Sequence, residues 1–377
     1  MRREPGRALT VVAASAAALL LTPWVIPAAA ESENESSFGP ERPYRLVWDD
    51  YSNGLDTEGP DADWWLLADG DYVADDGIVT TSRGQVEIAA SGTHPETGEP
   101  AFTNTLAQEE ENGGIRGDLD HVKWLSYANH EASTGQMGFD AVPGRELSCE
   151  TTMWGHTTGT EEHPFGDAVV DPQDDLRLAS VGLTVHDVET DTLFEFLFTN
   201  TQIYVFYERL AANRTEDNNY WSFLYTIPVA DREPEDSHRF RISYDRENGK
   251  VFWYLDGRRV FEVDRIGESL DPTDDIDYGD YLMLDHGGVE EEVEPRQLAC
   301  GMGSFTIVDG AVAQPGHDGD GLVKLSTAED HYFDPVLGEP YQQNFLDEES
   351  LEGNRVWGQG ATFGMTPLVI SSTPIRR

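Results

Sequence analysis

The chain has 377 residues, with 71 acidic and 25 basic side chains and a formal net charge of −46. A charge of this sign repels nucleic acid and anionic lipid, so it excludes proteins that bind either one through a basic surface. With 38% hydrophobic residues, the length suits one large all-β domain or two domains of moderate size. A salty or acidic habitat explains the charge, and collection of cations by the surface is the alternative.

The N-terminus has the order of a secretory signal. Three arginines lie within the first seven residues, an apolar run spans 8–26, and small residues follow at 28–30. This order predicts a signal peptide over residues 1–30 and an exported, soluble mature protein. An uncleaved membrane anchor is the alternative, because the apolar run is about long enough to span a bilayer. The polar segment 31–43, rich in Ser and Glu, predicts a disordered leader.

The strongest structural signal is the segment 237–264, SHRFRISYDRENGKVFWYLDGRRVFEVD. Apolar and polar residues alternate in it with the period of two that is typical of β-strands. Asn248-Gly249 and Asp256-Gly257 supply residues that tolerate the positive φ of tight hairpin turns. The segment therefore predicts three consecutive antiparallel strands.

Similar patterns predict an all-β body. The other expected strands are 44–48, 78–81, 85–89, 178–186, 193–198, 203–208, 220–227 and 305–308. Gly, Pro, Asp and His are dense in the intervening segments, which predicts long irregular loops at 109–117, 155–173 and 269–280.

The predicted domain organisation is a β-sandwich over 44–310, a linker at 311–322 and a C-terminal extension over 323–377. The extension is too short for a comfortable core of its own, so we expect it to pack on the sandwich.

Cys149 and Cys300 are the two cysteines of the chain. In an exported protein they predict one internal disulfide. A catalytic thiol is the weaker alternative, since no activating His has a specific spacing to either residue.

The all-β body and the hairpin FWYLDG at 252–257 resemble the concanavalin A-like lectin and glucanase superfamily. That resemblance covers about 44–310 and implies a jelly-roll sandwich of two curved antiparallel sheets. Phrases such as DHVKW at 120–124 and LDHGG at 284–288 are similar to an uncharacterised family of exported actinobacterial proteins, which implies no reaction.

The superfamily includes retaining glucanases with a Glu-x-Asp-x-(x)-Glu strand, and that resemblance points to ETDTLFE at 189–195. Their chemistry needs two carboxylates about 5 Å apart, one ionised and one protonated. Here the spacing departs from the pattern by one or two residues, and 189–192 predicts a hairpin turn. The glucanase motif is therefore not matched.

Glu195 interrupts the apolar strand LFEFLF, and burying a lone carboxylate costs several kcal/mol. One interpretation is a structural ion pair with Arg209, Arg239 or Arg241. The other is a cleft on the concave sheet in which Glu195 and Glu208 perform acid–base catalysis. In that cleft the expected ligand-binding residues are Tyr204, Arg209, Tyr220, Trp221, Arg241 and Trp253, with aromatic faces against the ligand.

Histidines in the loops add candidates for a general base. They are His121, His156 and His286, of which His121 and His286 are the preferred catalytic candidates if the loops converge. Each alone is more often a hydrogen-bonding loop residue. No zinc spacing is present, so no metal cofactor is predicted. A structural calcium ion held by Asp171, Asp174 and Asp175 is conceivable, although the spacing is not that of a dedicated loop.

The sequence thus predicts an exported carbohydrate-active protein, either a glycoside hydrolase or a polysaccharide lyase. The alternatives are a non-catalytic carbohydrate-binding or surface protein and an enzyme of secondary metabolism with a small apolar substrate. The expected partner is a glycan or another small molecule, with no nucleic acid and no membrane after signal cleavage. The oligomeric state is not predicted.

Overall fold

The computed structural model describes residues 42–375 except 60, 70–71, 103–120, 212, 216, 271–282, 311–312, 315–316, 319–320, 328–332, 335–338 and 341–343. The predicted signal peptide and nearly all of the predicted leader lie outside the described residues, as does much of the predicted linker. Among the described residues, no helix is long and apolar enough to cross a bilayer.

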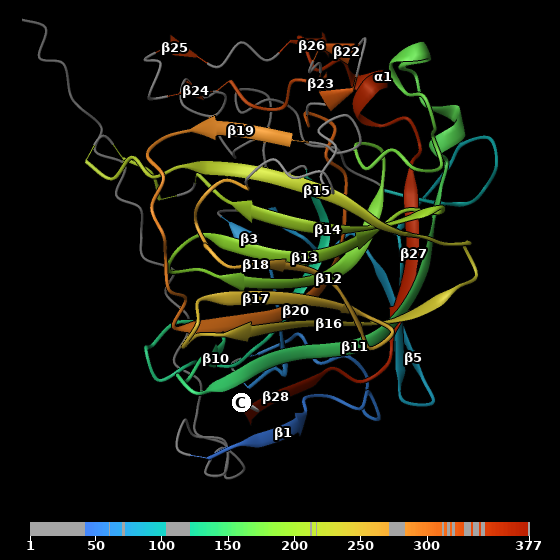
Figure 1. Ribbon diagram of the computed structural model, residues 1–377. Helices are drawn as coiled ribbons and strands as arrows, with labels where there is room; N and C mark the ends of the chain where they lie inside the picture. Colours follow the sequence, from blue (N-terminus) through green and yellow to red (C-terminus); the bar gives the residue numbers. More distant parts are fainter. Residues whose placement is uncertain are drawn as a thin grey trace, which may run out of the picture.

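Two large antiparallel sheets form the molecule (Figure 1). The first sheet has the order β18–β17–β16–β11–β27–β6–β5, and β28 joins β11 to β1. Its strands are β1 (Tyr44–Val47), β5 (Ile78–Ser82), β6 (Gln85–Ala89), β11 (Arg145–Thr158), β16 (Ser237–Asp245), β17 (Lys250–Leu255), β18 (Arg258–Val263), β27 (Gly360–Met365) and β28 (Val369–Pro374).

The second sheet has the order β19–β15–β14–β13–β12–β20–β9–β2, and β10 pairs with β20. Its strands are β2 (Trp64–Leu66), β9 (Val122–Ala128), β10 (Phe139–Asp140), β12 (Ser180–Asp187), β13 (Thr192–Phe198), β14 (Gln202–Arg209), β15 (Ser222–Asp231), β19 (Met283–Gly287) and β20 (Gln297–Phe305). The predicted all-β jelly-roll sandwich of two antiparallel sheets is confirmed.

Short elements lie outside the two large sheets. They are β3 (Ala68–Asp69) with β4 (Tyr72–Val73), β7 (Gly92–Thr93) with β8 (Pro100–Ala101), β21 (Ala313–Gln314) with β22 (His317–Asp318), β23 (Gly321–Val323) with β26 (Phe345–Asp347), β24 (Phe333–Asp334) with β25 (Glu339–Pro340), the 3-10 turns Thr160–Glu162 and Gly166–Ala168, and α1 (Glu352–Arg355).

The predicted three-stranded segment is confirmed as β16, β17 and β18, which pair in succession. Gly249, Asp256 and Gly257 all have positive φ at the two turns. The residues chosen from the sequence as turn formers therefore adopt the backbone conformation for which they were chosen.

Alternation along β13 divides its side chains between two cores. Phe194, Phe196 and Phe198 belong to the core between the sheets, where Trp253 and Phe240 of the first sheet contact them. Leu197 belongs to a second cluster on the opposite side of the second sheet. We call that side the outer face of the second sheet. Glu195 alternates with the phenylalanines, so it lies on the outer face.

The C-terminal part of the chain differs from the prediction. Rather than packing on the sandwich, β27 and β28 are strands of the first sheet, and both pair with β11. β11 also runs four residues into the segment 155–173 that we expected to be irregular. Gly and Ser interrupt the apolar alternation of β27 and β28, so the alternation pattern did not predict these strands.

The predicted disulfide is confirmed. Cys149 of β11 and Cys300 of β20 are bonded, with their Cα atoms 6.0 Å apart. Both residues are fully buried, so the bond crosses the core and ties the first sheet to the second.

Candidate functional site

Glu195 and Glu208 lie on neighbouring strands of the second sheet. Glu195 of β13 is opposite Phe206 of β14, and Glu208 of β14 is opposite Leu193. The two glutamates are therefore diagonal neighbours on the outer face, an arrangement with Cβ atoms about 7–8 Å apart or slightly less. At that spacing their carboxyl groups can turn toward each other. We call Glu195 and Glu208 the dyad.

Glu195 is the more enclosed member of the dyad, with 3% of its surface exposed. Burial raises the pKa of its carboxyl to about 7, and a hydrogen bond from Thr184 opposes that rise. Thr184 lies directly opposite Glu195 on β12. Its hydroxyl favours the ionised form of Glu195, because a carboxylate accepts a hydrogen bond more strongly than a neutral carboxyl.

Glu208 is partly exposed. Its pKa is raised to about 8, mainly by burial and also by the charge of Glu195, while His121 opposes the rise. The two carboxyls therefore interact and titrate as a pair. The hydrogen bond from Thr184 favours the ionised form at Glu195, and the charge of Glu195 favours the protonated form at Glu208. An ionised and a protonated carboxyl side by side are the groups that acid–base catalysis requires.

Tyr127 of β9 adds a hydroxyl to the site. A Cβ atom on Gly301 of β20 would lie 2.7 Å from Cδ1 of Tyr127, so the absence of a side chain at Gly301 makes room for the ring. The Tyr127 hydroxyl reaches Thr184 Oγ1 at 3.4 Å. Burial raises the pKa of Tyr127, and the charges of Glu195 and Glu208 add to the rise. The phenol is therefore protonated. Because the Thr184 hydroxyl donates to Glu195, the phenol is left to donate to Thr184 Oγ1.

His186 follows two residues after Thr184 on β12 and lies on the same outer face. Its ring centroid is 6.2 Å from that of Tyr127. Burial lowers the pKa of His186 to about 4, so the ring is neutral at pH 7. Its Nε2 atom is buried, and within the described part of the chain no hydrogen-bond partner reaches it.

His121 is the predicted histidine that the fold brings to the dyad. Its Nε2 atom forms an ion pair with Asp309, which is completely buried. Both residues are close enough to change the pKa of Glu208, in opposite directions. His156 is exposed on β11 of the first sheet. His286 falls in β19, whose side chains lie outside the described part.

Tyr204 is the predicted ligand-binding residue that lies on the outer face. It is opposite Leu197 across β13 and β14 and belongs to the same apolar cluster. Its hydroxyl is 3.5 Å from the backbone oxygen of Asp174. Tyr204 therefore lies on the same face of the sheet as the dyad, but only 8% of its surface is exposed.

The predicted role of Trp253 in binding is wrong. Trp253 is fully buried between the sheets, where it packs against Phe194 and Phe261. Its Nε1 atom donates to the backbone oxygen of Glu195 at 2.8 Å. The period of two in β17 directs it inward with Val251, so it supports the strand of Glu195 from behind.

Arg209 does not form the ion pair with Glu195 that was one interpretation of the sequence. It forms an ion pair with Glu291 at 2.8 Å and lies 4.0 Å from the ring centroid of Tyr220. Tyr220 in turn donates to Asp191 at 2.6 Å. Arg209 follows Glu208 directly on β14, so its side chain leaves the opposite face. Arg209 and Tyr220 are thus structural residues at the β12–β13 turn rather than ligand-binding residues.

Trp221 and Arg241 also lie elsewhere. Trp221 packs against the core between the sheets. Arg241 belongs to β16 of the first sheet, opposite Glu150, and lies 3.8 Å from the ring centroid of Tyr254. The predicted ion pair between Glu195 and Arg241 is therefore wrong, because the two residues belong to different sheets.

We expect Tyr220→Phe to lower the free energy of unfolding by about 1 kcal/mol, the usual value of one hydrogen bond. Turnover of a substrate should stay unchanged, because Tyr220 lies outside the outer face. Urea unfolding beside an activity assay measures both quantities. If the variant keeps parental stability and has lower turnover, Tyr220 is a residue of the site.

The suggested calcium ligands are engaged by protein donors. Asp175 forms an ion pair with Arg177 at 2.6 Å, and Asp174 accepts a hydrogen bond from Thr199 at 2.8 Å. The described residues contain no group of three or more His, Cys, Asp or Glu side chains arranged to hold a metal ion.

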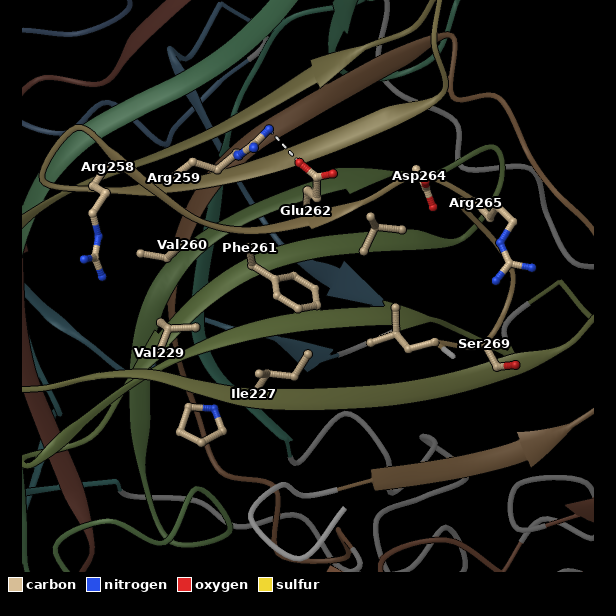
Figure 2. A pocket seen from close by; sticks show the side chains of 13 residues that line it. Ile227, Val229, Arg258, Arg259, Val260, Phe261, Glu262, Asp264, Arg265 and Ser269 are labelled. Carbon is tan, nitrogen blue, oxygen red and sulfur yellow. Dashed lines mark ion pairs between the residues drawn. The ribbon is translucent and has the colours of Figure 1, made fainter. Parts of the chain in front are cut away.

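A groove of about 710 Å³ opens between β15 and β18. Figure 2 shows Ile227, Val229 and Phe261 among its apolar lining, with Arg258, Arg259 and Arg265 around it. Arg259 pairs with Glu262 at 2.6 Å and Arg265 with Glu268 at 3.0 Å. Glu262 and Asp264 also line the groove, and both pair with Lys250, at 3.9 and 3.8 Å. The dyad lies on the other side of the second sheet.

Residues 48–374 match the model of a protein family described as a family of unknown function, DUF6081. The chain belongs to this family. The chain is also similar to the uncharacterized protein L829 of Acanthamoeba polyphaga mimivirus, with 27% identity over 300 residues. The similarity covers 64% of this chain and 62% of that protein. Membership in an exported actinobacterial family stays a prediction.

Solved structures similar to this DUF6081 chain include a β-1,3-1,4-glucanase (lichenase) from a mouse hindgut metagenome, with 10% identity and a TM-score of 0.36 over 88% of this chain and 99% of the other. The κ-carrageenase of Pseudoalteromonas carrageenovora has 10% identity and a TM-score of 0.36 over 91% and 100%. These similarities assign no role to any residue.

Four residues of the site were absent from the sequence-based candidates, namely Tyr127, Thr184, His186 and Asp309. Tyr127 reaches Thr184 across β20, which separates their strands. If β12 and β13 are paired as a hairpin from the sequence, Thr184 falls opposite Glu195. That pairing was the available signal for Thr184.

We expect Thr184→Val to raise the pKa of Glu195 further, because the variant lacks the hydroxyl that stabilises the carboxylate. The acid limb of the pH–rate profile should move to higher pH. At low pH kcat/KM should fall about fivefold, the equivalent of a hydrogen bond of ~1 kcal/mol, with a smaller loss at pH 8. Thr184→Ser is the matched control. Equal losses at all pH values would contradict the assigned role.

Proposed function

We propose that this protein is an exported enzyme that cleaves glycosidic bonds in a polysaccharide on the outer face of the second sheet. The observation that carries the proposal is the dyad: two diagonal carboxyls on adjacent strands, both with a pKa raised by burial, with the charge of Glu195 adding to the rise at Glu208. Cleavage of a glycosidic bond needs one protonated and one ionised carboxyl. The predicted signal peptide and the disulfide support export.

In this proposal Glu195 is the nucleophile and Glu208 the general acid. The Glu195 carboxylate attacks the anomeric carbon while the bond from that carbon to the bridging oxygen breaks, and Glu208 gives its proton to the leaving oxygen. Glu208, now ionised, takes a proton from water, which attacks the same carbon and releases Glu195. Diagonal neighbours allow the separation of about 5 Å that this retaining route requires.

The other groups have supporting parts in this proposal. Tyr127 donates toward Thr184, and Thr184 donates to Glu195, which holds Glu195 ionised for attack. Tyr204 and Phe206 belong to the buried apolar cluster on the same face, and they support the strand that carries Glu208.

The test is a reducing-end and mass-spectrometric assay of the purified protein across soluble polysaccharides in high salt. We expect shortened chains that have gained water, with the anomeric configuration retained in proton NMR. Products that lack the added water would show elimination instead. Stabilisation by a polysaccharide without any product would identify a binding protein and overturn the proposal.

A further inference from the structure

We propose that the dyad acts on a polysaccharide without anionic substituents, and that the charge of the site excludes uronic and sulfated polymers. This inference rests on the proposed function and specifies its substrate class. It concerns the sign of the charges that the described residues place around Glu195 and Glu208 and the internal contacts that engage Arg177 and Arg214.

The described side chains around the dyad are acidic or neutral. Asp309 lies close enough to Glu208 to raise its pKa, and the neutral ring of His186 adds no charge at pH 7. Among the described residues, the basic group that lowers the pKa of Glu208 is His121, which is already paired with Asp309. Polymers with a carboxylate or sulfate on each sugar are held by forked or clustered Arg and Lys side chains.

Arg214, in the loop between β14 and β15, and Arg177, just before β12, are engaged in internal contacts. Arg214 donates to Ser222 at 2.8 Å and to Asn219 at 3.4 Å. Arg177 holds Asp175 through two parallel hydrogen bonds of 2.9 and 2.6 Å. Binding an anionic sugar would require breaking these contacts.

Four internal segments outside the described side chains contain few basic residues. The segments 103–120, 271–287, 311–320 and 328–343, whose side chains are not described, contain seventeen Asp and Glu residues and one basic residue, Arg116. Any contribution from these segments to the site is therefore predominantly acidic.

An anionic substituent beside the dyad would also disable the chemistry. A negative charge raises the pKa of a neighbouring carboxyl, and the pKa of Glu195 already lies at about 7. A substrate carboxylate would shift Glu195 toward its protonated form, which cannot attack. The same field slows the approach of an anionic polymer, and salt weakens that effect.

The experiment compares polymers that share a backbone and differ in charge. The pairs are hydroxyethyl and carboxymethyl cellulose, and laminarin and carboxymethyl laminarin, assayed at 10 mM and 1 M NaCl. The Debye length falls from about 30 Å to about 3 Å over this range. We expect kcat/KM to be at least about tenfold higher for the uncharged member in low salt, with the ratio falling to about two- to threefold in 1 M NaCl.

Equal rates within each pair, or a preference that does not change with salt, would overturn the inference while leaving the proposed function intact. Cleavage of no polymer at all would refute the proposed function. In that event thermal stabilisation by the same pairs still tests the charge preference. The control is Glu235→Gln, which removes one exposed carboxylate from the loop after β15 and should leave the ratio unchanged.

Discussion

Glu195→Gln and Glu208→Gln are each expected to reduce kcat by about 10³-fold or more, because an amide neither attacks an anomeric carbon nor donates a proton as a carboxylic acid does. Both variants should fold. Reducing-end and mass-spectrometric assays on a substrate of the parent protein measure the loss. The parent should be most active between the two pKa values, about 7 and about 8, and lose activity on either side.

The same variants should be more stable than the parent at alkaline pH. The pKa of Glu195 is higher in the folded state than in the unfolded chain, so ionisation costs folding energy. This cost is absent below the ordinary glutamate pKa, grows as the pH rises, and is complete above about pH 7. Glu195→Gln should therefore gain on the order of 2–3 kcal/mol at pH 9 and little at pH 4.

The matched control is Glu150→Gln, which removes a strand glutamate opposite Arg241 in the first sheet. It should retain parental turnover. Activity above a tenth of the parental value in Glu195→Gln, with the fold intact, would show that the dyad is not the catalytic pair.

The double variant Cys149→Ala/Cys300→Ala is expected to lose on the order of 4–5 kcal/mol of stability. The disulfide joins residues 151 positions apart, and a crosslink of that span removes much of the chain entropy of the unfolded state. The bond also joins the two sheets directly. Urea unfolding at fixed pH, compared with the parent under oxidising and reducing conditions, measures the loss.

A parent protein whose urea midpoint is the same in oxidising and reducing buffer would contradict this expectation. The single variants serve as controls, because each breaks the disulfide and leaves one buried thiol. They should be destabilised about as much as the double variant.

Local patterns in the sequence predicted the β16–β18 segment and the turn between β12 and β13. Gly249, between β16 and β17, and Asp191, between β12 and β13, adopt positive φ, a conformation that their residue types tolerate at little cost. Such features depend on neighbours within a few residues, so a single sequence contains them. The pairing of β11 with β27 and β28 joins segments about 200 residues apart, and no local pattern encodes it.

The candidate site, too, was predicted by local patterns only in part. Alternation separates Glu195 from Phe194 and Phe196, but it does not say which face meets the other sheet. For that reason Glu195 was predicted on a functional face together with Trp253, which in fact lies in the core. Glu208 and Arg209 are adjacent, so an accessible Glu208 required Arg209 to point the other way. That constraint was available in the sequence and argued against Arg209 as a ligand-binding residue.

The neighbouring positions of β1 and β28 have a consequence for biosynthesis. β28 pairs with β1 on one side and with β11 on the other, so the strand at 44–47 waits for a partner about 320 residues further along the chain. The first sheet therefore cannot close before residue 374 has left the ribosome. In the export that we propose, the chain would cross a narrow channel unfolded, and this topology delays closure of the sandwich until residue 374 is available.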